Sequence, residues 1–302
     1  MIRKLILLAS PLFAAPALAQ MPDFSKVEIK TETLAPGVAV LFGAGGNIGV
    51  SHGPDGTVLI DDQFAPLTGK IEAAVAALGA APVRFLVNTH WHFDHSGGNE
   101  NFGKTATILA HKSVRTRLAA GGAVAGNTLP PAPPHALPEI TYDDGVQFHL
   151  NGDTIDAVFS GGGHTDGDTV LYWRKANVLH TGDLMMSNAP FPFIDVGSGG
   201  NAVTLVATLD KALAMIDAQT KVIPGHGPVV TRVELKAWRD RIADGVETVR
   251  KARAAKQSLE GLLAANPLKV HDKPGAFINA DAFVRAVWRS LDAAPTADGH
   301  AH

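Results

Sequence analysis

The sequence predicts an α/β fold built from two successive halves, each running from strands into helices. Short apolar runs separated by Gly-rich turns are typical of strands in a sheet. Longer runs with helical spacing follow these strands in each half. The chain has 302 residues, of which 46% are hydrophobic and 18% charged, so it can bury a large core. No linker or short repeat divides it, and residues 20–302 are expected to form a single domain.

Residues 1–19 have the three parts of a secretory signal peptide. Arg3 and Lys4 give the charged start, an apolar stretch follows, and Ala17-Leu18-Ala19 is a cleavage site of the small-x-small type. A membrane anchor is the weaker interpretation because the stretch is short and interrupted by prolines. We therefore expect cleavage after Ala19 and a secreted or periplasmic protein that no longer associates with a membrane.

The absence of Cys and the small net charge exclude several kinds of site and partner. The chain has no Cys, so a lipoprotein anchor, a thiolate nucleophile and a thiolate metal ligand are all excluded. Any metal ligands must be His, Asp or Glu. The formal net charge of −3 gives no reason to expect a nucleic-acid partner, and a small-molecule substrate is the expected partner. The sequence does not specify the oligomeric state.

In the first half, strand-like runs alternate with helical spacing. The pattern predicts strands at 38–42, 48–51, 57–60, 83–87 and 106–110, and helices at 66–78, 98–103 and 112–119. Gly79 is a typical helix stop. Residues 120–138 lose all periodicity and are rich in Gly, Ala and Pro, so they are predicted to form a loop, either a lid over a site or a solvated connector.

The second half repeats the order of strands before helices. The predicted strands are 140–142, 146–150, 154–159, 169–173, 178–180 and 222–223, and the predicted helices are 202–218, 232–256 and 282–291.

The stretch from His90 to His95, which reads HWHFDH, is the most informative motif. It follows the apolar run 83–87, and the ends of buried strands are where α/β folds gather ligand-binding groups. His90 and His92 are two apart, so on an extended backbone they point the same way and can share one ion. Asp94 and His95 follow where the chain turns and can reach a second ion. Although a lone His is usually structural, four potential ligands within six residues favour a metal site.

HWHFDHSGGN resembles the signature of the metallo-β-lactamase superfamily, a large set of mostly zinc-dependent hydrolases. The resemblance implies a four-layer αββα sandwich, with two central sheets and helices on both outer faces. Three further motifs follow in the family's order: GGGHTDGD with His164, HTGD with Asp183, and PGHG with His226.

The resemblance also implies a ligand set for two zinc ions per chain. One ion would be held by His90, His92 and His164, the other by Asp94, His95 and His226, and Asp183 would bridge the two. Three nitrogen ligands with an open position suit catalytic zinc. Two ions about 3.5–4 Å apart lower the pKa of a bridging water, so hydroxide is available at neutral pH. Asp94 is a candidate for orienting this nucleophile.

The sequence departs from the best-known zinc β-lactamases. Those enzymes place a Cys where Asp183 stands and a Lys three residues later, where this chain has Met186. No Lys or Arg occurs from 184 to 210. The apolar segment 185–194, which includes Phe193, is either a pocket wall or core packing. Asn201 is either a polar contact to substrate or the N-cap of the following helix.

The predicted activity is hydrolysis of a neutral lactone, ester or cyclic amide by a metal-bridging hydroxide. A zinc β-lactamase is the main alternative. An iron-dependent oxidoreductase on the same fold and a non-catalytic zinc-binding protein are further alternatives. Glyoxalase-type thioesterases also keep the Asp, but export argues against a cytosolic thiol. His180 lies three residues before Asp183 and either supports the ligands or packs in its strand. The histidines without a matching motif, at positions 52, 111, 135, 149, 271, 300 and 302, are expected to be structural or at the surface.

Overall fold

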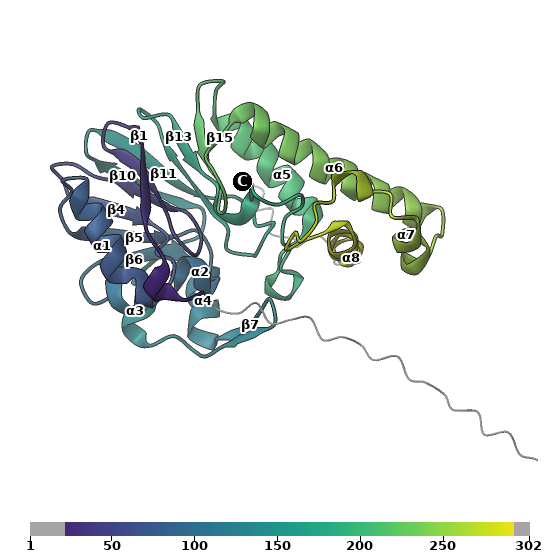
Figure 1. Ribbon diagram of the computed structural model, residues 1–302, viewed down its shortest axis with the longest axis horizontal. Coiled ribbons are helices and arrows are strands. Elements are labelled where there is room, and N and C mark those ends of the chain that lie inside the picture. Colours follow the sequence, from purple (N-terminus) through teal and green to yellow (C-terminus); the bar gives the residue numbers. More distant parts are fainter. Residues whose placement is uncertain (1–21, 293–302) are drawn as a thin grey trace, which may run out of the picture.

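The structure is a computed structural model that describes residues 22–292 (Figure 1). The predicted signal peptide and its cleavage site lie outside the described residues, as do His300 and His302. Within residues 22–292, no helix is long and apolar enough to cross a membrane.

The first sheet has seven strands in the order β1-β2-β3-β4-β5-β6-β9. They are β1 (Lys30–Ala35), β2 (Val38–Phe42), β3 (Ile48–Ser51), β4 (Thr57–Ile60), β5 (Val83–Asn88), β6 (Thr107–His111) and β9 (Ile140–Tyr142). The first four strands form an antiparallel meander, because the turns between them are too short for any other connection. From β4 onward the strands are parallel, because helices provide the three crossovers. These helices are α1 (Thr68–Ala77), then α2 (Phe93–Ser96) with α3 (Asn99–Phe102), and finally α4 (Lys112–Ala120).

The second sheet has six strands in the order β10-β11-β12-β13-β14-β15. They are β10 (Gly145–Leu150), β11 (Asp153–Phe159), β12 (Thr169–Trp173), β13 (Val178–His180), β14 (Lys221–Ile223) and β15 (Val230–Thr231). Only β13 and β14 are parallel in this sheet, and the crossover between them contains α5 (Ala202–Met215).

The two sheets pack face to face through residues that alternate along each strand. Val38 and Val40 of β2 point into the layer between the sheets, where they meet buried side chains such as Trp173. Ala39 and Leu41 point to the opposite face, against the layer that contains α1. Both faces are therefore buried, which explains why these strands read as continuous apolar runs. Each fully buried aliphatic side chain contributes roughly 1.5–3 kcal/mol of transfer free energy.

Helices cover the outer face of each sheet (Figure 1). On the second sheet, the cover consists of α5, α6 (Arg232–Ala254), α7 (Leu259–Ala265) and α8 (Ala280–Ser290), packed in one apolar cluster with that sheet. The α6 helix begins with a capping box, in which the Thr231 and Glu234 side chains each bond the other's backbone N–H. The predicted four-layer αββα architecture is confirmed.

One stretch differs from its predicted structure. Residues 120–138 were expected to lack regular structure, but they contain a small hairpin of β7 (Gly122–Val124) and β8 (Asn127–Leu129). The turn residues Ala125 and Gly126 have φ of 49° and 84°, as a tight hairpin turn requires. Each strand has only three residues, and Ala125 is not a usual residue for that turn, so the hairpin leaves no periodic signal in the sequence. Further elements without a predicted counterpart are β1, β15, α7 and the one-turn helix α2 (Phe93–Ser96).

Candidate metal centre

The predicted ligands come from loops that follow strand ends in both sheets. His90 and His92 follow β5, and His92 is the N-cap residue of α2. Asp94 lies in the first turn of α2, next to His95. In the second sheet, β13 runs into a 3-10 turn (η4, Gly182–Leu184) that carries Asp183. These loops converge because the two sheets are stacked, so the ends of β5, β13 and β14 reach the same edge of the sandwich.

The first group of ligand atoms lies below the surface. One ligand atom from each of four residues lies within 4.8 Å of the other three, and all four residues are buried: His90, His92, His164 and Asp183. Nδ1 of His92 lies 2.9 Å from Nε2 of His164, which in turn lies 3.6 Å from Oδ2 of Asp183. The spacing fits a small cation held between the rings.

In two of these rings, the nitrogen that faces away from the group donates a hydrogen bond to a neighbouring oxygen. Nε2 of His92 donates to Oδ2 of Asp195 at 2.9 Å, and Nδ1 of His164 donates to the carbonyl of Phe193 at 2.7 Å. In the neutral rings, the two inner nitrogens therefore both present lone pairs, although they lie 2.9 Å apart. Two facing lone pairs repel each other, so this contact needs a cation.

His90 also donates from one ring nitrogen and presents a lone pair on the other. The Thr89 hydroxyl donates to Oδ2 of Asp61 at 2.8 Å, so its oxygen is left to accept from Nδ1 of His90 at 3.0 Å. Nε2 of His90 then carries a lone pair, is buried, and has no hydrogen-bond partner among residues 22–292. An unpartnered buried acceptor is costly, so this atom marks a ligand position.

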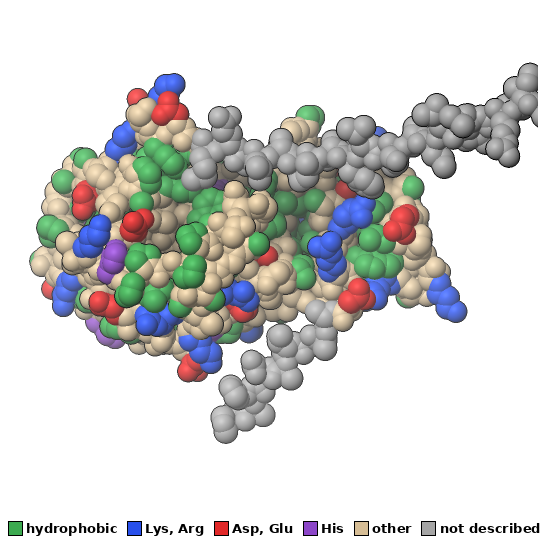
Figure 2. All heavy atoms as spheres, turned by 90° about the horizontal axis from the view of Figure 1, so that it is seen from below, with side chains coloured by type: hydrophobic (Ala, Val, Ile, Leu, Met, Phe, Trp, Pro, Cys, Tyr) green, Lys and Arg blue, Asp and Glu red, His purple; other side chains and the backbone are tan. Residues whose placement is uncertain are grey.

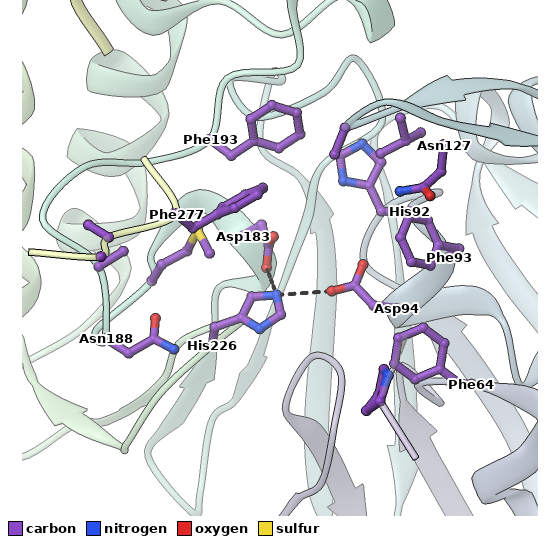
Figure 3. Close-up of a pocket in the computed structure, with 17 residues that line it drawn as sticks. Phe64, His92, Phe93, Asp94, Asn127, Asp183, Asn188, Phe193, His226 and Phe277 are labelled. Atoms are coloured by element: carbon purple, nitrogen blue, oxygen red, sulfur yellow. Dashed lines mark ion pairs between the residues drawn. The ribbon is translucent and has the colours of Figure 1, made fainter. Parts of the chain in front are cut away.

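The second group meets the first at Asp183. Nδ1 of His95 donates to Oδ2 of Asp61 at 2.7 Å, which leaves Nε2 of His95 facing Nε2 of His226 at 3.2 Å. Oδ2 of Asp94 lies 3.3 Å from the same His226 nitrogen (Figure 3). Oδ1 of Asp183 lies 3.1 Å from His95 and 3.4 Å from His226, while its Oδ2 faces His164. Asp183 therefore has one carboxylate oxygen toward each group, as a bridging ligand requires.

Electrostatics differ between the two groups. Burial lowers the pKa of His164 to about 4 and that of His90 well below its usual range, so both rings stay neutral and can coordinate a metal. Burial also opposes a charge on His226, but the carboxylates of Asp183 and Asp94 outweigh it and raise this pKa to about 10. Burial would raise the pKa of Asp94, yet His95 and His226 hold it at about 2. The carboxylate of Asp94 is therefore anionic at neutral pH and can bind a cation.

Two glycines give the backbone close access to the ligands. A Cβ on Gly46 would lie 2.1–2.5 Å from ring atoms of His95, and one on Gly225 would lie 1.9 Å from Oδ1 of Asp183. Any larger residue would displace these side chains. The Gly-rich turn between β2 and β3 is thus part of the centre.

Asn47 joins that turn to the loops of the second sheet. Its Nδ2 donates to the carbonyls of both Pro224 and Gly227 at 2.8 Å, on either side of His226. Its own carbonyl accepts from Nε2 of His180 at 3.0 Å, and Nδ1 of His180 accepts from the N–H of Gly182 at 3.1 Å. His180 therefore supports the loops that carry Asp183 and His226 and does not reach the ligand atoms itself.

A cavity of about 470 Å³ opens onto the second group. Phe193 lines it, with Phe64 and Phe93 also in the wall, and the floor includes Asp94, Asp183 and His226 (Figure 3). Among the described residues, no Lys or Arg lines it. Hydrophobic side chains also gather in the middle of the face shown in Figure 2.

Segment 185–194 contributes both to the cavity wall and to the core, the two roles that the sequence allows. Met185, Phe191 and Ile194 are buried in the core of the second sheet, whereas Met186 and Phe193 line the cavity. The hairpin of β7 and β8 also reaches the cavity, through Val124, Ala125 and Asn127.

Asn201 requires a correction. The sequence allows it two roles, a contact to substrate or a helix N-cap, and the first is wrong because Asn201 is not among the residues that line the cavity. Its Oδ1 accepts from the N–H groups of Val203 and Thr204, and its Nδ2 donates to the carbonyl of Ser290. Asn201 is the N-cap of α5. The oxygen and the nitrogen of its side-chain amide already have hydrogen-bond partners within the protein.

The structure brings all seven predicted ligands together, and it adds three residues that the sequence did not single out. Asp61 and Asp195 hold the rings of His95 and His92, and Asn47 holds the loop of His226. Asp61 directly follows β4, and a carboxylate at a strand end is a weak signal for such a role. Asp195 and Asn47 lie in loops where nothing in the local pattern distinguishes them.

Known proteins resemble this chain in sequence and in fold. The profile of the Metallo-beta-lactamase superfamily matches residues 42–226. The "Lactamase-like protein adaB" of Aspergillus niger is 29% identical over 225 residues, covering 72% of this chain and 61% of that protein. The "Acyl-coenzyme A thioesterase MBLAC2" of Gallus gallus is 30% identical over 165 residues, covering 49% of this chain and 58% of that protein. The chain thus spans about 60% of the length of these two curated relatives.

A solved structure supports the fold independently. A metallo-beta-lactamase from Pontibacter korlensis superimposes with a TM-score of 0.60 at 19% identity, over 72% of this chain and 99% of that one. The likeness is one of architecture. Because the family profile covers more than half of the chain and spans every predicted ligand from His90 to His226, this chain belongs to the metallo-beta-lactamase superfamily.

Proposed function

We propose that this protein is an exported hydrolase with two zinc ions per chain, and that it opens a neutral lactone, ester or cyclic amide. The observation that carries this proposal is the cavity of about 470 Å³, which ends on Asp94, Asp183 and His226 and has no Lys or Arg among the described residues of its wall. A cavity of this size suits a small-molecule substrate. A wall without Lys or Arg suits an uncharged substrate.

The ligand set fits zinc. The inner nitrogens of His90, His92 and His164 carry lone pairs and lie close to one another, and His95, His226 and two carboxylates complete the set. Zinc accepts His nitrogen and carboxylate oxygen in the mixed sets seen here. When bound, a pair of such ions lowers the pKa of a water molecule and polarises an oxygen of the substrate.

The protein's own groups bind and orient the reactants. Asp94 lines the cavity and stays ionised at neutral pH, so its carboxylate can accept a hydrogen bond from an incoming water molecule and orient that molecule toward the substrate. Asp183 lies at the floor, between the two ligand groups, and fixes their separation. The aromatic side chains of the wall lower the polarity around a bound substrate, which strengthens the electrostatic interactions on it.

The name of one relative is consistent with hydrolysis of an acyl group. One relative is named an acyl-coenzyme A thioesterase, and thioesters share the uncharged acyl carbonyl of esters. Hydrolysis of β-lactams is the alternative within the family. A β-lactam drug carries a carboxylate, and the described wall offers it two anionic Asp side chains and no Lys or Arg.

The test combines metal analysis with a substrate panel. Purified protein is dialysed against zinc, its metal content is measured by elemental analysis, and hydrolysis of neutral lactones and esters is compared with that of a chromogenic β-lactam. We expect two zinc ions per chain and at least one neutral substrate that exceeds the β-lactam in kcat/KM. One tightly held ion at saturation, or iron as the activating metal, would refute the dinuclear zinc centre. A β-lactam hydrolysed far better than every neutral substrate would make the β-lactamase the better assignment.

A further inference from the structure

One wall of the cavity comes from outside the matched part of the chain. The family profile ends at residue 226, yet Gly275, Ala276 and Phe277 line the cavity. They belong to the segment between a 3-10 turn (η6, Lys269–His271) and α8. Phe277 is 60% exposed, although its ring lies 5.8 Å from the ring of Phe193, which also lines the cavity. An exposed Phe at the mouth of a cavity is available to a ligand.

The segment that carries Phe277 is fixed on both sides. Oδ1 of Asp272 accepts from the N–H of Ala280 at 2.6 Å, which closes the loop at the start of α8. The next residue after Phe277, Ile278, is buried in the core cluster of the second sheet. Phe283 of α8 stacks on Phe191 at 4.8 Å. Phe277 is therefore exposed although its loop is anchored, and the loop holds the ring in place over the cavity.

Aromatic rings also form the opposite wall. Phe64 and Phe93 line the cavity, and their ring centroids are 5.9 Å apart. In Figure 3, Phe193 and Phe277 lie on one side of the metal ligands, and Phe64 and Phe93 lie on the other. The cavity is thus a slot with aromatic sides above a polar floor. Such a slot gains free energy from apolar area that it removes from water.

We propose that Phe277 selects the substrate of this centre, and that this substrate is an uncharged ester whose acyl chain is apolar and lies in the slot. The inference rests on the proposed hydrolytic function. In ester hydrolysis the leaving oxygen gains negative charge, and burial among aromatic rings opposes such a charge. The apolar walls therefore suit the acyl side, which stays uncharged along its chain.

Phe277 can be altered without disturbing the metal ligands. Its ring contact is to Phe193, whereas Phe193 itself packs 5.8 Å and 5.7 Å from the rings of His92 and His164. Phe277→Ala thus removes part of the wall and leaves the centre unchanged. Val270→Ala is the matched control, because Val270 lies seven residues earlier, in η6, is 84% exposed and does not line the cavity.

The first experiment measures kcat/KM of the zinc-loaded protein on p-nitrophenyl acetate, butyrate, hexanoate and octanoate. We expect kcat/KM to rise with chain length, by up to roughly fourfold per buried methylene. Phe277→Ala should lower the octanoate value by about tenfold and leave acetate within about twofold, because only the longer chain reaches this ring. Phe277→Leu should restore part of the loss, and Val270→Ala should match the unaltered protein.

A second series varies the alcohol of an alkyl acetate, and a third experiment measures binding of 2-alkanones to chelator-treated protein by calorimetry. Chain-length dependence confined to the alcohol side, or an equal effect of Phe277→Ala on acetate and octanoate, would overturn the inference. The absence of any ester hydrolysis, together with 2-decanone binding that Phe277→Ala weakens, would refute the hydrolytic function and support the apolar slot. If 2-alkanones bind equally well at every length, the slot itself is refuted.

Discussion

His92 and Asp195 lie 103 residues apart in the sequence, and Nε2 of the ring meets Oδ2 of the carboxylate at 2.9 Å. This contact fixes the proton on Nε2 and turns Nδ1 toward the metal centre. Ser198 donates to the same carboxylate through its hydroxyl at 2.6 Å, so Asp195 is itself held in position. The pair shows how a loop of the second sheet sets the orientation of a ligand delivered by the first.

The first prediction follows from this pair. Asp195→Ala should weaken metal binding by roughly 10–100-fold, because the His92 ring loses the group that fixes its tautomer and orientation. Competition with a chromogenic chelator measures the affinity. Asp156→Ala is the control, since this carboxylate pairs with Arg174 and belongs to neither group of ligand atoms. An unchanged metal affinity in Asp195→Ala would show that the contact does not position the ring.

The second prediction concerns Asp183. Asp183→Asn should weaken one metal more than the other and abolish most hydrolysis, because an amide is uncharged and cannot balance two cations. The change is nearly isosteric, so thermal unfolding of the chelator-treated protein should stay close to that of the parent. His180→Gln is the comparison, because His180 supports the loops without reaching the ligand atoms. It should cost less activity. Full activity with full metal content in Asp183→Asn would exclude the bridging role.

The third prediction concerns Asn47. Asn47→Ala should lower the free energy of unfolding by roughly 1–3 kcal/mol, because the carbonyls of Pro224 and Gly227 lose their donor. It should also reduce affinity at the site of His226 more than at the other site. Denaturant unfolding and stepwise metal titration measure the two effects. An equal loss at both sites would contradict a specific role for Asn47.

The fourth prediction concerns the pH dependence of stability in chelator-treated protein. The pKa of His226 is about 10 in the folded protein, above its ordinary value of 6.5. The folded state therefore binds this proton more tightly, so the stabilisation is complete below about pH 6.5 and is lost as the pH rises toward 10. Thermal unfolding should show a lower Tm at pH 9.5 than at pH 6.5. The difference should shrink in His226→Gln, and an undiminished difference in that variant would assign the effect to other groups.

The fifth prediction concerns export. The charged start, the apolar stretch and the Ala-x-Ala site predict cleavage after Ala19. N-terminal sequencing of protein recovered from its native host should then read from Gln20. A chain that still begins at Met1 would refute this expectation.

Much of the fold follows from local pattern. The strands β2, β3 and β4 lie where the sequence predicts them, because each has a short apolar run bounded by Gly-rich turns. The hairpin of β7 and β8 was missed because strands of three residues do not produce a detectable period. Helix α7 is also short, and its start at the Ser258 cap is its only clear local signal.

The sequence by itself predicted the seven candidate ligands, because they lie in short motifs whose residue types suit a metal and whose order matches the family. The tertiary structure alone decided which side chains orient those ligands and what surrounds them. Asp195 meets His92, and Asn47 meets the loop of His226, only once the two sheets stack. Phe277 reaches the cavity only because α8 anchors its loop beside Phe193. Contacts between residues so distant in sequence depend on packing, and neither local propensity nor spacing encodes them.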